Sequence, residues 1–429
     1  MFIEFSIGNF RSFKKIVTLS LVAAKLKAKN PRLDEGNVFT LPSQPDLLTS
    51  AVIYGANASG KSNLVAALNF MRGFVLDSPN ATQATGAIGV ERFRLNTQTE
   101  NEPTHCEAVF VVDGLRYRYG FTVTPERVES EWLFVVPTTR EALLFERKGD
   151  GVVLGQRFGE GKEIIERTRP NALFLSVVAQ FNGKIAQQIV HWFRQMGIAS
   201  GLDDVGMYTF TIQHFRGGDY ASDILALIQF LDMGIEKLEV KSTELPRFQP
   251  NNRGESLRNS LLRAKAEDDG EFFTVRSTHR KFNSEGEPAG VECFDFDAYE
   301  SEGTKKLFAL AGPIAAALRQ GRVLVIDELD ARLHPLLTST LVRLFNSRET
   351  NPHHAQLIFT THDINLLGSD LFRRDQVWFT EKDRVGATAL YSLAEFRVRN
   401  DASFERDYLK GRYGAIPFLG DMPALTESR

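Results

Sequence analysis

GANASGKS, residues 55–62, lies between the apolar segment SAVIYG (50–55) and the helical pattern of NLVAALNFMRGFVL (63–76). A strand, a glycine-rich turn and a helix in this order predict a phosphate-binding loop, because glycines let successive N–H groups face phosphate oxygens. We expect Lys61 to reach the β- and γ-phosphates and the Ser62 hydroxyl to bind Mg²⁺. The residues expected at the nucleotide are Gly55, Ala56, Asn57, Ala58, Ser59, Gly60, Lys61, Ser62 and Asn63.

VLVIDELD, residues 323–330, supplies the acidic groups that such a loop requires. Four apolar residues predict a buried strand, and carboxylates follow where it ends. Asp327 suits the Mg²⁺ shell, and Glu328 can polarise an attacking water as a general base. An apolar strand ending in acids is often only a solvated strand end. Together with residues 55–62, however, it favours ATP hydrolysis.

FTTHD, residues 359–363, repeats the pattern of an apolar strand that ends in polar side chains. A single histidine is more often structural than functional. Because this strand follows the acidic one in the chain, we expect His362 to donate a hydrogen bond to the γ-phosphate.

Composition limits the class of protein. The 429 residues carry a net charge of −3, so no overall basic field indicates nucleic acid. Cys106 and Cys293 are the only cysteines and lack metal-site spacing, which fits a reducing cytoplasm. The apolar run at 307–318 is too short to span a bilayer, and Glu4 and Arg11 make the start a poor signal peptide. We therefore expect a cytoplasmic protein without a membrane partner.

Periodicity predicts an α/β chain in three parts. Residues 1–160 form an N-terminal lobe with the phosphate-binding loop and antiparallel strands, in which Asp113-Gly114 predicts a hairpin turn. Residues 161–289 are predicted to be a mainly helical insertion, with helix over 222–240 and no clear strand over 241–272. Residues 290–429 form a C-terminal lobe that begins with a strand at 290–299. Residues 28–46, which contain three prolines, are predicted to be an exposed loop.

The order GANASGKS, ESEGTKK, VLVIDELDARLHP and FTTHD resembles the ABC-type ATPase heads of SMC, RecF and OLD proteins. The phrases FIEFSIGNFRSF, GLRYRYGF, FRRDQVWFTEKD and GRYGAIP resemble more closely the bacterial AAA family ATPases of the RloA and AbiL abortive-infection type. The resemblance runs over most of the chain and is loosest over 160–290. It implies an ABC-ATPase head with a mixed β subdomain, and we find no heptad run long enough for a long coiled coil.

In such heads two copies enclose ATP, and a signature turn of one copy caps the γ-phosphate bound by the other. The resemblance places this turn at Ser301-Glu302-Gly303, where Ser301 and Gly303 would contact the nucleotide. Glu302 is unfavourable beside a triphosphate, so it must point away or meet a cation such as Lys305 or Lys306. Asp330 matches a loop that crosses the dimer interface. Arg11 and Ser12 match an N-terminal nucleotide contact, and Gln83 and Gln98 are weak candidates for a Mg²⁺-sensing glutamine.

An ATPase head of this kind requires an effector on which ATP binding or hydrolysis acts. After His362 only 67 residues (429 − 362) follow, too few for a nuclease domain, so we expect a separate effector, a nuclease or toxin. The resemblance implies an ATP-dependent homodimer or higher oligomer that controls this effector in anti-phage defence. The alternative is a RecF- or SMC-like ATP-gated DNA-binding protein in repair or chromosome maintenance, with Arg373-Arg374 or Arg258, Arg263 and Lys265 at phosphates. A P-loop kinase is less favoured, because a kinase needs no histidine after a second strand.

Overall fold

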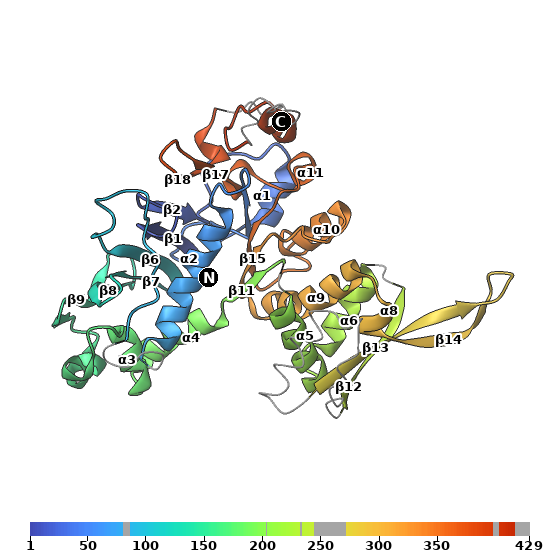
Figure 1. Ribbon diagram of the computed structural model, residues 1–429, viewed down its shortest axis with the longest axis horizontal. Coiled ribbons are helices and arrows are strands. Elements are labelled where there is room, and N and C mark those ends of the chain that lie inside the picture. Colours follow the sequence, from blue (N-terminus) through green and yellow to red (C-terminus); the bar gives the residue numbers. More distant parts are fainter. Residues whose placement is uncertain (80–85, 203, 232–233, 244–271, 398–402, 417–429) are drawn as a thin grey trace, which may run out of the picture.

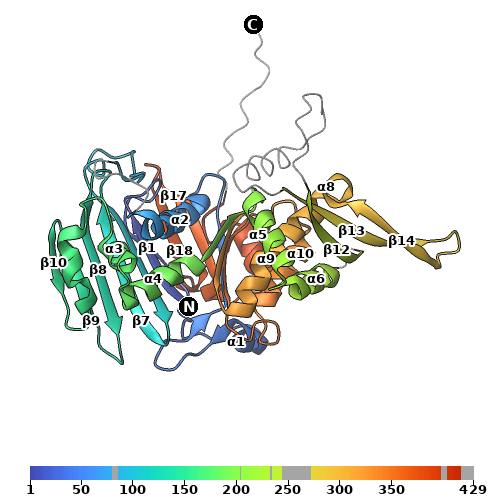
Figure 2. The same cartoon turned by 90° about the horizontal axis from the view of Figure 1, so that it is seen from below.

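The structure is a computed structural model that describes residues 1–429 except 80–85, 203, 232–233, 244–271, 398–402 and 417–429. Two lobes lie side by side and are joined by a central sheet (Figure 1). A long two-stranded extension projects from the second lobe, as Figure 2 shows from a second direction. The predicted mixed α/β class is confirmed, and no long coiled coil occurs in the part of the chain that the structure describes.

The central sheet has six strands in the order β11-β15-β16-β5-β17-β18. All neighbours run parallel except β17 and β18, which are antiparallel. Their bounds are β5 (Ser50–Tyr54), β11 (Gly197–Ser200), β15 (Val323–Asp327), β16 (Gln356–Thr360), β17 (Val377–Lys382) and β18 (Thr388–Ser392). Parallel strands are covered on both faces, which explains why β5 and β16 are buried throughout and apolar at their centres.

Alternate side chains of the central strands enter two different hydrophobic cores. Val323, Val325 and Ile358 pack with α2 (Lys61–Asp77) and the antiparallel sheet. Leu324 and Ile326 pack on the other face with α9 (Glu302–Gln320) and its neighbours. This two-sided burial fixes the register of the strands, because a shift by one residue would exchange the faces.

The first lobe contains a seven-stranded antiparallel sheet in the order β10-β9-β8-β7-β6-β1-β2. The predicted hairpin at Asp113-Gly114 is confirmed, with φ values of 49° and 78° at the two turn residues. Both values suit a two-residue hairpin turn. The bounds are β1 (Phe2–Gly8), β2 (Val17–Ser20), β6 (Thr104–Val112), β7 (Leu115–Val123), β8 (Val128–Val136), β9 (Ala142–Lys148) and β10 (Gly151–Leu154).

Gln356, at the start of β16, joins the two sheets. Its side-chain oxygen accepts from the Phe2 N–H at 2.6 Å, and its amide nitrogen donates to the Phe2 carbonyl at 2.9 Å. The same nitrogen lies 3.1 Å from the carbonyl oxygen of Leu48. A fully buried amide that is bonded in this way fixes how the antiparallel sheet lies against the parallel one.

The region predicted to be a helical insertion contains more strand than expected. Helix α6 (Ala221–Phe230) ends early, and β12 (Ile235–Thr243) follows, so the helix predicted over 222–240 is wrong in its second half. Gly234 has φ 65°, a left-handed conformation that interrupts a helix. β12 pairs with β13 (Phe272–Phe282), which pairs with β14 (Pro288–Asp295). The strand predicted at 290–299 ends at Asp295, whose side chain caps the short helix α8 (Phe296–Tyr299).

Residues 28–46 are not a plain loop. Asn30 caps α1 (Pro31–Asn37), and Pro31 occupies the first turn, where its missing N–H costs nothing. The remaining elements are β3 (Val38–Phe39), β4 (Leu47–Leu48), η1 (Gly159–Arg167), α3 (Phe174–Gln180), α4 (Lys184–Gln195), α5 (Val205–Gly217), α10 (Pro335–Phe345), α11 (Asn365–Gly368), η2 (Arg374–Gln376), η3 (Leu393–Glu395) and α12 (Phe404–Leu409). Among the described residues, no helix is both long enough and apolar enough to cross a membrane.

Candidate functional site

Three predicted segments meet at one edge of the central sheet. β16 lies between β5 and β15, and all three run parallel. Their carboxyl ends therefore point to the same edge, where residues 55–62, 327–330 and 361–363 follow them. The strand order is what brings these distant segments together, and ligands of open α/β sheets bind at such an edge.

The loop at 55–62 depends on two glycines. A Cβ atom on Gly55 would lie 2.5 Å from the Ser59 hydroxyl and from Thr380. Gly60 has φ 114° and precedes α2, and a Cβ atom there would lie 2.5 Å from the hydroxyl of Thr388. The first N–H groups of α2 have no acceptor within the helix and carry its positive end, so they suit a phosphate.

Lys61 is buried and folded back onto its own loop. Its ammonium donates to the Gly55 carbonyl at 2.8 Å and to the Ala56 carbonyl at 3.2 Å. Burial lowers the pKa of Lys61 below its usual value of 10.5, and the charges of Glu328 and Asp327 oppose that shift. These carboxylates therefore lie close enough to Lys61 for their charges to act on it.

The acidic strand end is held by Thr360, a residue for which the sequence pattern predicted no role. The Thr360 hydroxyl donates to Asp327 Oδ1 at 2.6 Å and accepts the Glu328 N–H at 2.7 Å. Glu328 has φ 54°, a left-handed conformation that non-glycine residues rarely adopt. Backbone strain of this kind is concentrated at functional sites. The run of two threonines in FTTHD was the available sequence signal.

Asp330 and His362 lie next to each other. The His362 N–H donates to Asp330 Oδ2 at 3.2 Å, and the imidazole itself is exposed. Asp330 Oδ1 is buried and has no hydrogen-bond partner among the described residues. Tyr54 supports this segment from β5, because its hydroxyl donates to the Asp363 carbonyl at 3.0 Å. An unpaired buried carboxylate oxygen of this kind is uncommon in folded proteins.

Ser12 and Arg11 lie beside the loop. The buried Ser12 hydroxyl accepts from Asn63 at 2.7 Å and from Thr388 at 2.8 Å, so it lies behind Gly60 and supports the loop. Arg11 has φ 45° and pairs with Glu91 at 2.7 Å. Direct contact of either residue with a nucleotide stays a prediction.

The predicted signature turn begins α9. The Ser301 side chain caps this helix by accepting the Thr304 N–H at 3.1 Å. Glu302 pairs with Lys305 at 3.0 Å and with Arg332 at 3.6 Å, so its charge is balanced within its own chain. The other cation considered for this role, Lys306, is instead fully buried and donates to the Gly201 carbonyl.

The predicted oxygen ligands suit Mg²⁺ in the way that nucleotide-dependent enzymes bind this ion. No group of three or more histidine, cysteine or acidic side chains suited to a metal exists within the described residues. The predicted ligands are two oxygens, from the exposed Ser62 and the half-buried Asp327. Mg²⁺ commonly takes one or two protein oxygens and completes its shell with water and phosphate.

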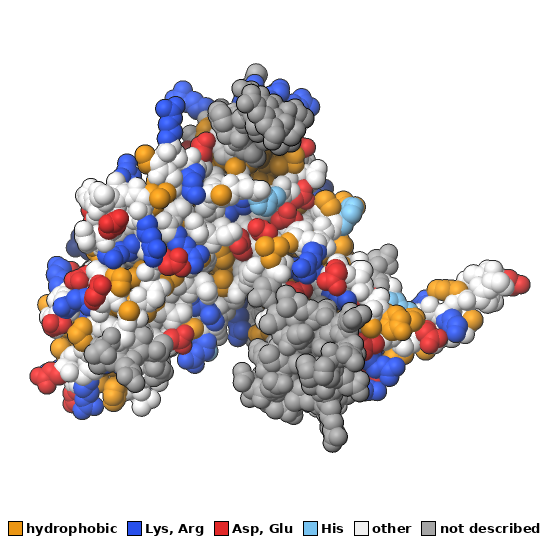
Figure 3. Space-filling view, in the orientation of Figure 1, with side chains coloured by type: hydrophobic (Ala, Val, Ile, Leu, Met, Phe, Trp, Pro, Cys, Tyr) orange, Lys and Arg blue, Asp and Glu red, His pale blue; other side chains and the backbone are white. Residues whose placement is uncertain are grey.

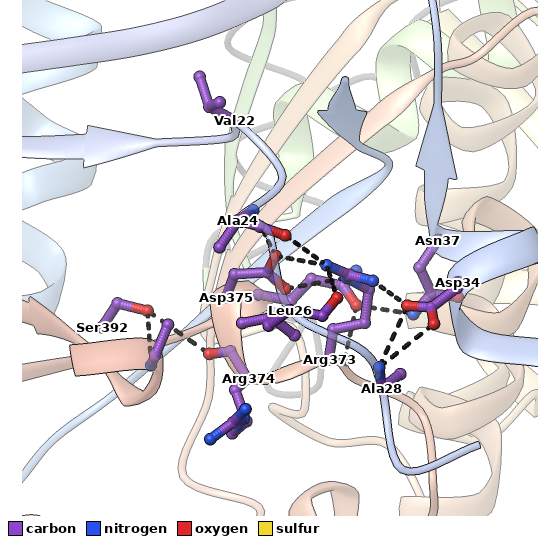
Figure 4. Close-up of polar contacts among 12 residues, drawn as sticks. Val22, Ala24, Leu26, Ala28, Asp34, Asn37, Arg373, Arg374, Asp375 and Ser392 are labelled. Atoms are coloured by element: carbon purple, nitrogen blue, oxygen red, sulfur yellow. Dashed lines mark hydrogen bonds and ion pairs between the residues drawn. The ribbon is translucent and has the colours of Figure 1, made fainter. Parts of the chain in front are cut away.

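Of the pair Arg373-Arg374, considered as a contact for DNA phosphates, Arg373 is not available to them. Arg373 is 4% exposed and pairs with Asp375 at 2.8 Å and with Asp34. Figure 4 shows its guanidinium between these carboxylates, with the Ala24 carbonyl 3.1 Å away. The prediction was wrong for Arg373, because its guanidinium pairs with Asp34 and Asp375 and so connects two segments of the fold. Arg258, Arg263, Lys265 and Gln83 lie outside the described residues, and Gln98 donates to Glu102 at 2.8 Å.

Residues 50–368 match a protein-family model described as "AAA domain, putative AbiEii toxin, Type IV TA system". The chain belongs to this family. The match begins at β5 and includes the loop at 55–62, the acidic strand end and His362. Membership of an AAA family implies nucleotide binding, and the narrower RloA and AbiL resemblance remains an expectation. No curated protein matches the sequence.

Among solved structures, the chain is similar to an SMC head bound to the C-winged helix domain of ScpA, with 16% identity and a TM-score of 0.41 over 94% of this chain and 99% of that one. It is also similar to the SMC head domain from Thermotoga maritima, with 13% identity and a TM-score of 0.39 over 91% and 98%. A third similar structure is an SMC head with an extended coiled coil, bound to the C-terminal domain of ScpA derived from Pyrococcus furiosus. Its sequence identity is 14% and its TM-score 0.39, over 96% of this chain and 98% of that one.

Proposed function

We propose that this protein is a Mg²⁺-dependent ATPase that dimerises around ATP and controls a separate effector, a nuclease or toxin, in bacterial abortive infection. The observation that carries the proposal is that Lys61, which follows β5, and Asp327 and Glu328, at the end of β15, lie at the same edge of the central sheet. A glycine loop, a buried lysine and an ordered pair of acids are the parts that ATP hydrolysis uses.

Each residue has a definite task in this proposal. Ser62 and Asp327 would hold Mg²⁺, which would offset the negative charge of the phosphates. Lys61 exchanges the carbonyls of Gly55 and Ala56 for phosphate oxygens, and the α2 N–H groups bind the same phosphates. Glu328 accepts a proton from the attacking water, while Thr360 keeps the neighbouring Asp327 oriented. In this proposal the exposed His362, whose N–H contacts Asp330, donates to the γ-phosphate.

The second half of each site comes from another copy in this proposal. Ser301 and Gly303 begin α9, and Asp330 carries an oxygen that lacks a partner among the described residues. Both features suit contact with a neighbour's nucleotide. We also propose a division of the chain into an N-terminal lobe (1–160), an insertion (161–289) whose helices α3 and α4 pack on the first lobe, and a C-terminal lobe (290–429).

The matched family's description supports a role with a toxin, because it names an AbiEii-type toxin and a toxin–antitoxin system. The absence of a membrane-crossing helix from the described residues is compatible with action in the cytoplasm. Replacing Glu328 by Gln tests the core of the proposal. We expect hydrolysis to fall about 100-fold or more while ATP still binds, because the amide cannot accept the proton.

In the same variant, ATP should convert monomer to dimer in analytical ultracentrifugation, and the dimer should persist because the nucleotide is not consumed. Glu349→Gln, at an exposed position away from the site, is the matched control and should hydrolyse ATP like the wild type. Wild-type turnover by the Glu328→Gln protein would remove Glu328 from the role of base.

A further inference from the structure

β11 is an edge strand whose second side has no partner strand among the described residues. It pairs with β15 alone, with Gly197 opposite Leu324 and Ser200 opposite Asp327. An exposed edge presents a row of main-chain donors and acceptors to which another extended chain can bind.

A groove of about 410 Å³ runs along this strand, between α4 of the first lobe and the helices α5 and α9 of the second. All four residues of β11 line it. Its walls are largely apolar and include Met196, Ile198, Met207, Phe210, Pro313 and Leu324. Methionine side chains adapt to different partners and are common on surfaces that bind peptides.

The charged residues that line the groove are all arginines, namely Arg72, Arg194 and Arg322, and no acidic residue is among the described residues that line it. Arg72 donates to the carbonyls of Phe193 and Arg194. Burial lowers the pKa of Arg72, the nearby Asp77 opposes that shift, and the Arg194 charge adds to it. Arg322 Nε is buried and has no hydrogen-bond partner within the described part of the chain. Figure 3 shows basic side chains beside the hollow between the two lobes.

We propose that this groove binds an extended segment of a partner protein, which adds to β11 as a strand and carries carboxylates that pair with the three arginines. An extended chain places alternate side chains on opposite faces of the sheet. Such a segment can therefore direct apolar side chains to the groove walls and acidic ones to its rim. Main-chain hydrogen bonds would supply affinity, and the arginines would select acidic sequences.

A peptide fits these features better than a nucleic acid or a second copy of the chain. Phe210 is the only aromatic side chain among the lining residues that the structure describes, whereas single-stranded nucleic acid is usually held on several aromatic rings. The strand edge offers donors and acceptors at the spacing of another backbone. The groove is also a recess between the two lobes, so it takes a single extended chain more readily than a globular surface.

Occupation of the groove would act on the nucleotide site through one residue, Gly201, whose N–H and carbonyl both contact parts of that site. The Gly201 N–H, directly after β11, donates to the Asp327 carbonyl at 2.5 Å. The Gly201 carbonyl accepts from Lys306, which lies on the helix that begins at Ser301. A strand added to β11 therefore stiffens the segment around Gly201, which contacts both Asp327 at the end of β15 and Lys306 on α9. This regulatory consequence rests on the proposed ATPase function, whereas the binding itself does not.

The test uses the full chain and a fluorescein-labelled decapeptide of alternating valine and glutamate. We expect saturable binding in fluorescence anisotropy. A valine–lysine peptide and a valine–glutamate peptide with two central prolines should bind at least about tenfold more weakly, because they lose the charge pairing or the main-chain donors. Hydrogen–deuterium exchange should slow at residues 197–200 when the first peptide is bound.

The double variant Arg194→Glu/Arg322→Gln should weaken binding of the valine–glutamate peptide at least about tenfold. Arg384→Glu, an exposed charge reversal away from the groove, should bind like the wild type. If the double variant unfolds, Arg194→Glu alone, at an exposed position, provides the same comparison. Equal binding by wild type and variant, or no saturable binding, overturns the proposal. Tighter binding of a ten-nucleotide oligothymidylate through the same arginines would also overturn it, in favour of nucleic acid.

A Lys61→Met protein separates the two proposals, because it should bind the peptide normally even when ATP binding is lost. Peptide should also change the ATPase rate of the wild type and leave that of the Arg194→Glu/Arg322→Gln protein unchanged. A peptide that binds to the groove without changing the rate would overturn only the regulatory consequence.

Discussion

The hydroxyl of Thr360 joins the ends of two neighbouring strands by donating to Asp327 Oδ1 at 2.6 Å. The same oxygen accepts the Glu328 N–H at 2.7 Å, where the backbone turns into a left-handed conformation. One side chain therefore orients the expected Mg²⁺ ligand and fixes the backbone of the expected general base.

Thr360→Val should remove both hydrogen bonds while keeping the shape of this buried side chain. We expect the kcat of ATP hydrolysis to fall about 10- to 100-fold, as is usual when the partner of a metal ligand is lost. Nucleotide affinity should change less, because the loop at 55–62 is intact. Thr360→Ser retains the hydroxyl and should keep most activity. Steady-state kinetics at several Mg²⁺ concentrations measure kcat for each variant. An unchanged kcat in Thr360→Val would contradict a role for the Thr360 hydroxyl in hydrolysis.

A mixture of two single variants, Lys61→Met and Ser301→Ala, tests whether the site is shared between copies. Each protein alone should be inactive, since Lys61 lies at the loop and Ser301 at the start of α9. In an equal mixture half of the dimers are mixed, and each mixed dimer has one complete site. About one quarter of the wild-type ATPase rate should therefore return. No recovery at any ratio would indicate that each chain works alone.

His105 gives the stability of the fold a dependence on pH. Burial lowers the pKa of His105 below 6.5, and the Glu107 charge opposes the shift only in part. The folded state therefore favours the neutral imidazole, and the unfolded state binds more protons below pH 6.5. We expect the free energy of unfolding to fall as pH falls from 6.5 towards the lowered pKa.

Urea unfolding of His105→Asn between pH 5 and pH 7.5 should show a smaller dependence on pH than the wild type. His353→Asn, an exposed position, should behave like the wild type. Identical curves for the wild type and His105→Asn would rule out His105 as the source.

Arg373→Met should destabilise the fold rather than weaken binding of DNA. It leaves Asp375 buried without its cation and removes the contact with Asp34. Loss of one partner from a buried ion pair costs about 3–5 kcal/mol of unfolding free energy. The adjacent and more exposed Arg374→Met is the matched control and should cost much less. Urea unfolding measures both, and a loss below about 1 kcal/mol in Arg373→Met would contradict the ion-pair account.

Local sequence patterns determined the parts of this protein whose structure depends on near neighbours in the chain. GANASGKS predicted the strand, turn and helix around Lys61, and Asp113-Gly114 predicted its hairpin, because backbone conformation at such turns is set by a few residues. Apolar runs also predicted the buried strands β15 and β16.

Tertiary structure alone decided which of these parts meet. No local pattern places β16 between β5 and β15, selects the hydroxyl of Thr360 as a common partner, or buries Arg373 between two carboxylates. The same holds for the strand β12, where the helical pattern of 222–240 was overridden by pairing with β13. Pairing between strands and burial of charge depend on contacts between residues far apart in the chain. Their free energy therefore cannot be predicted from any one segment.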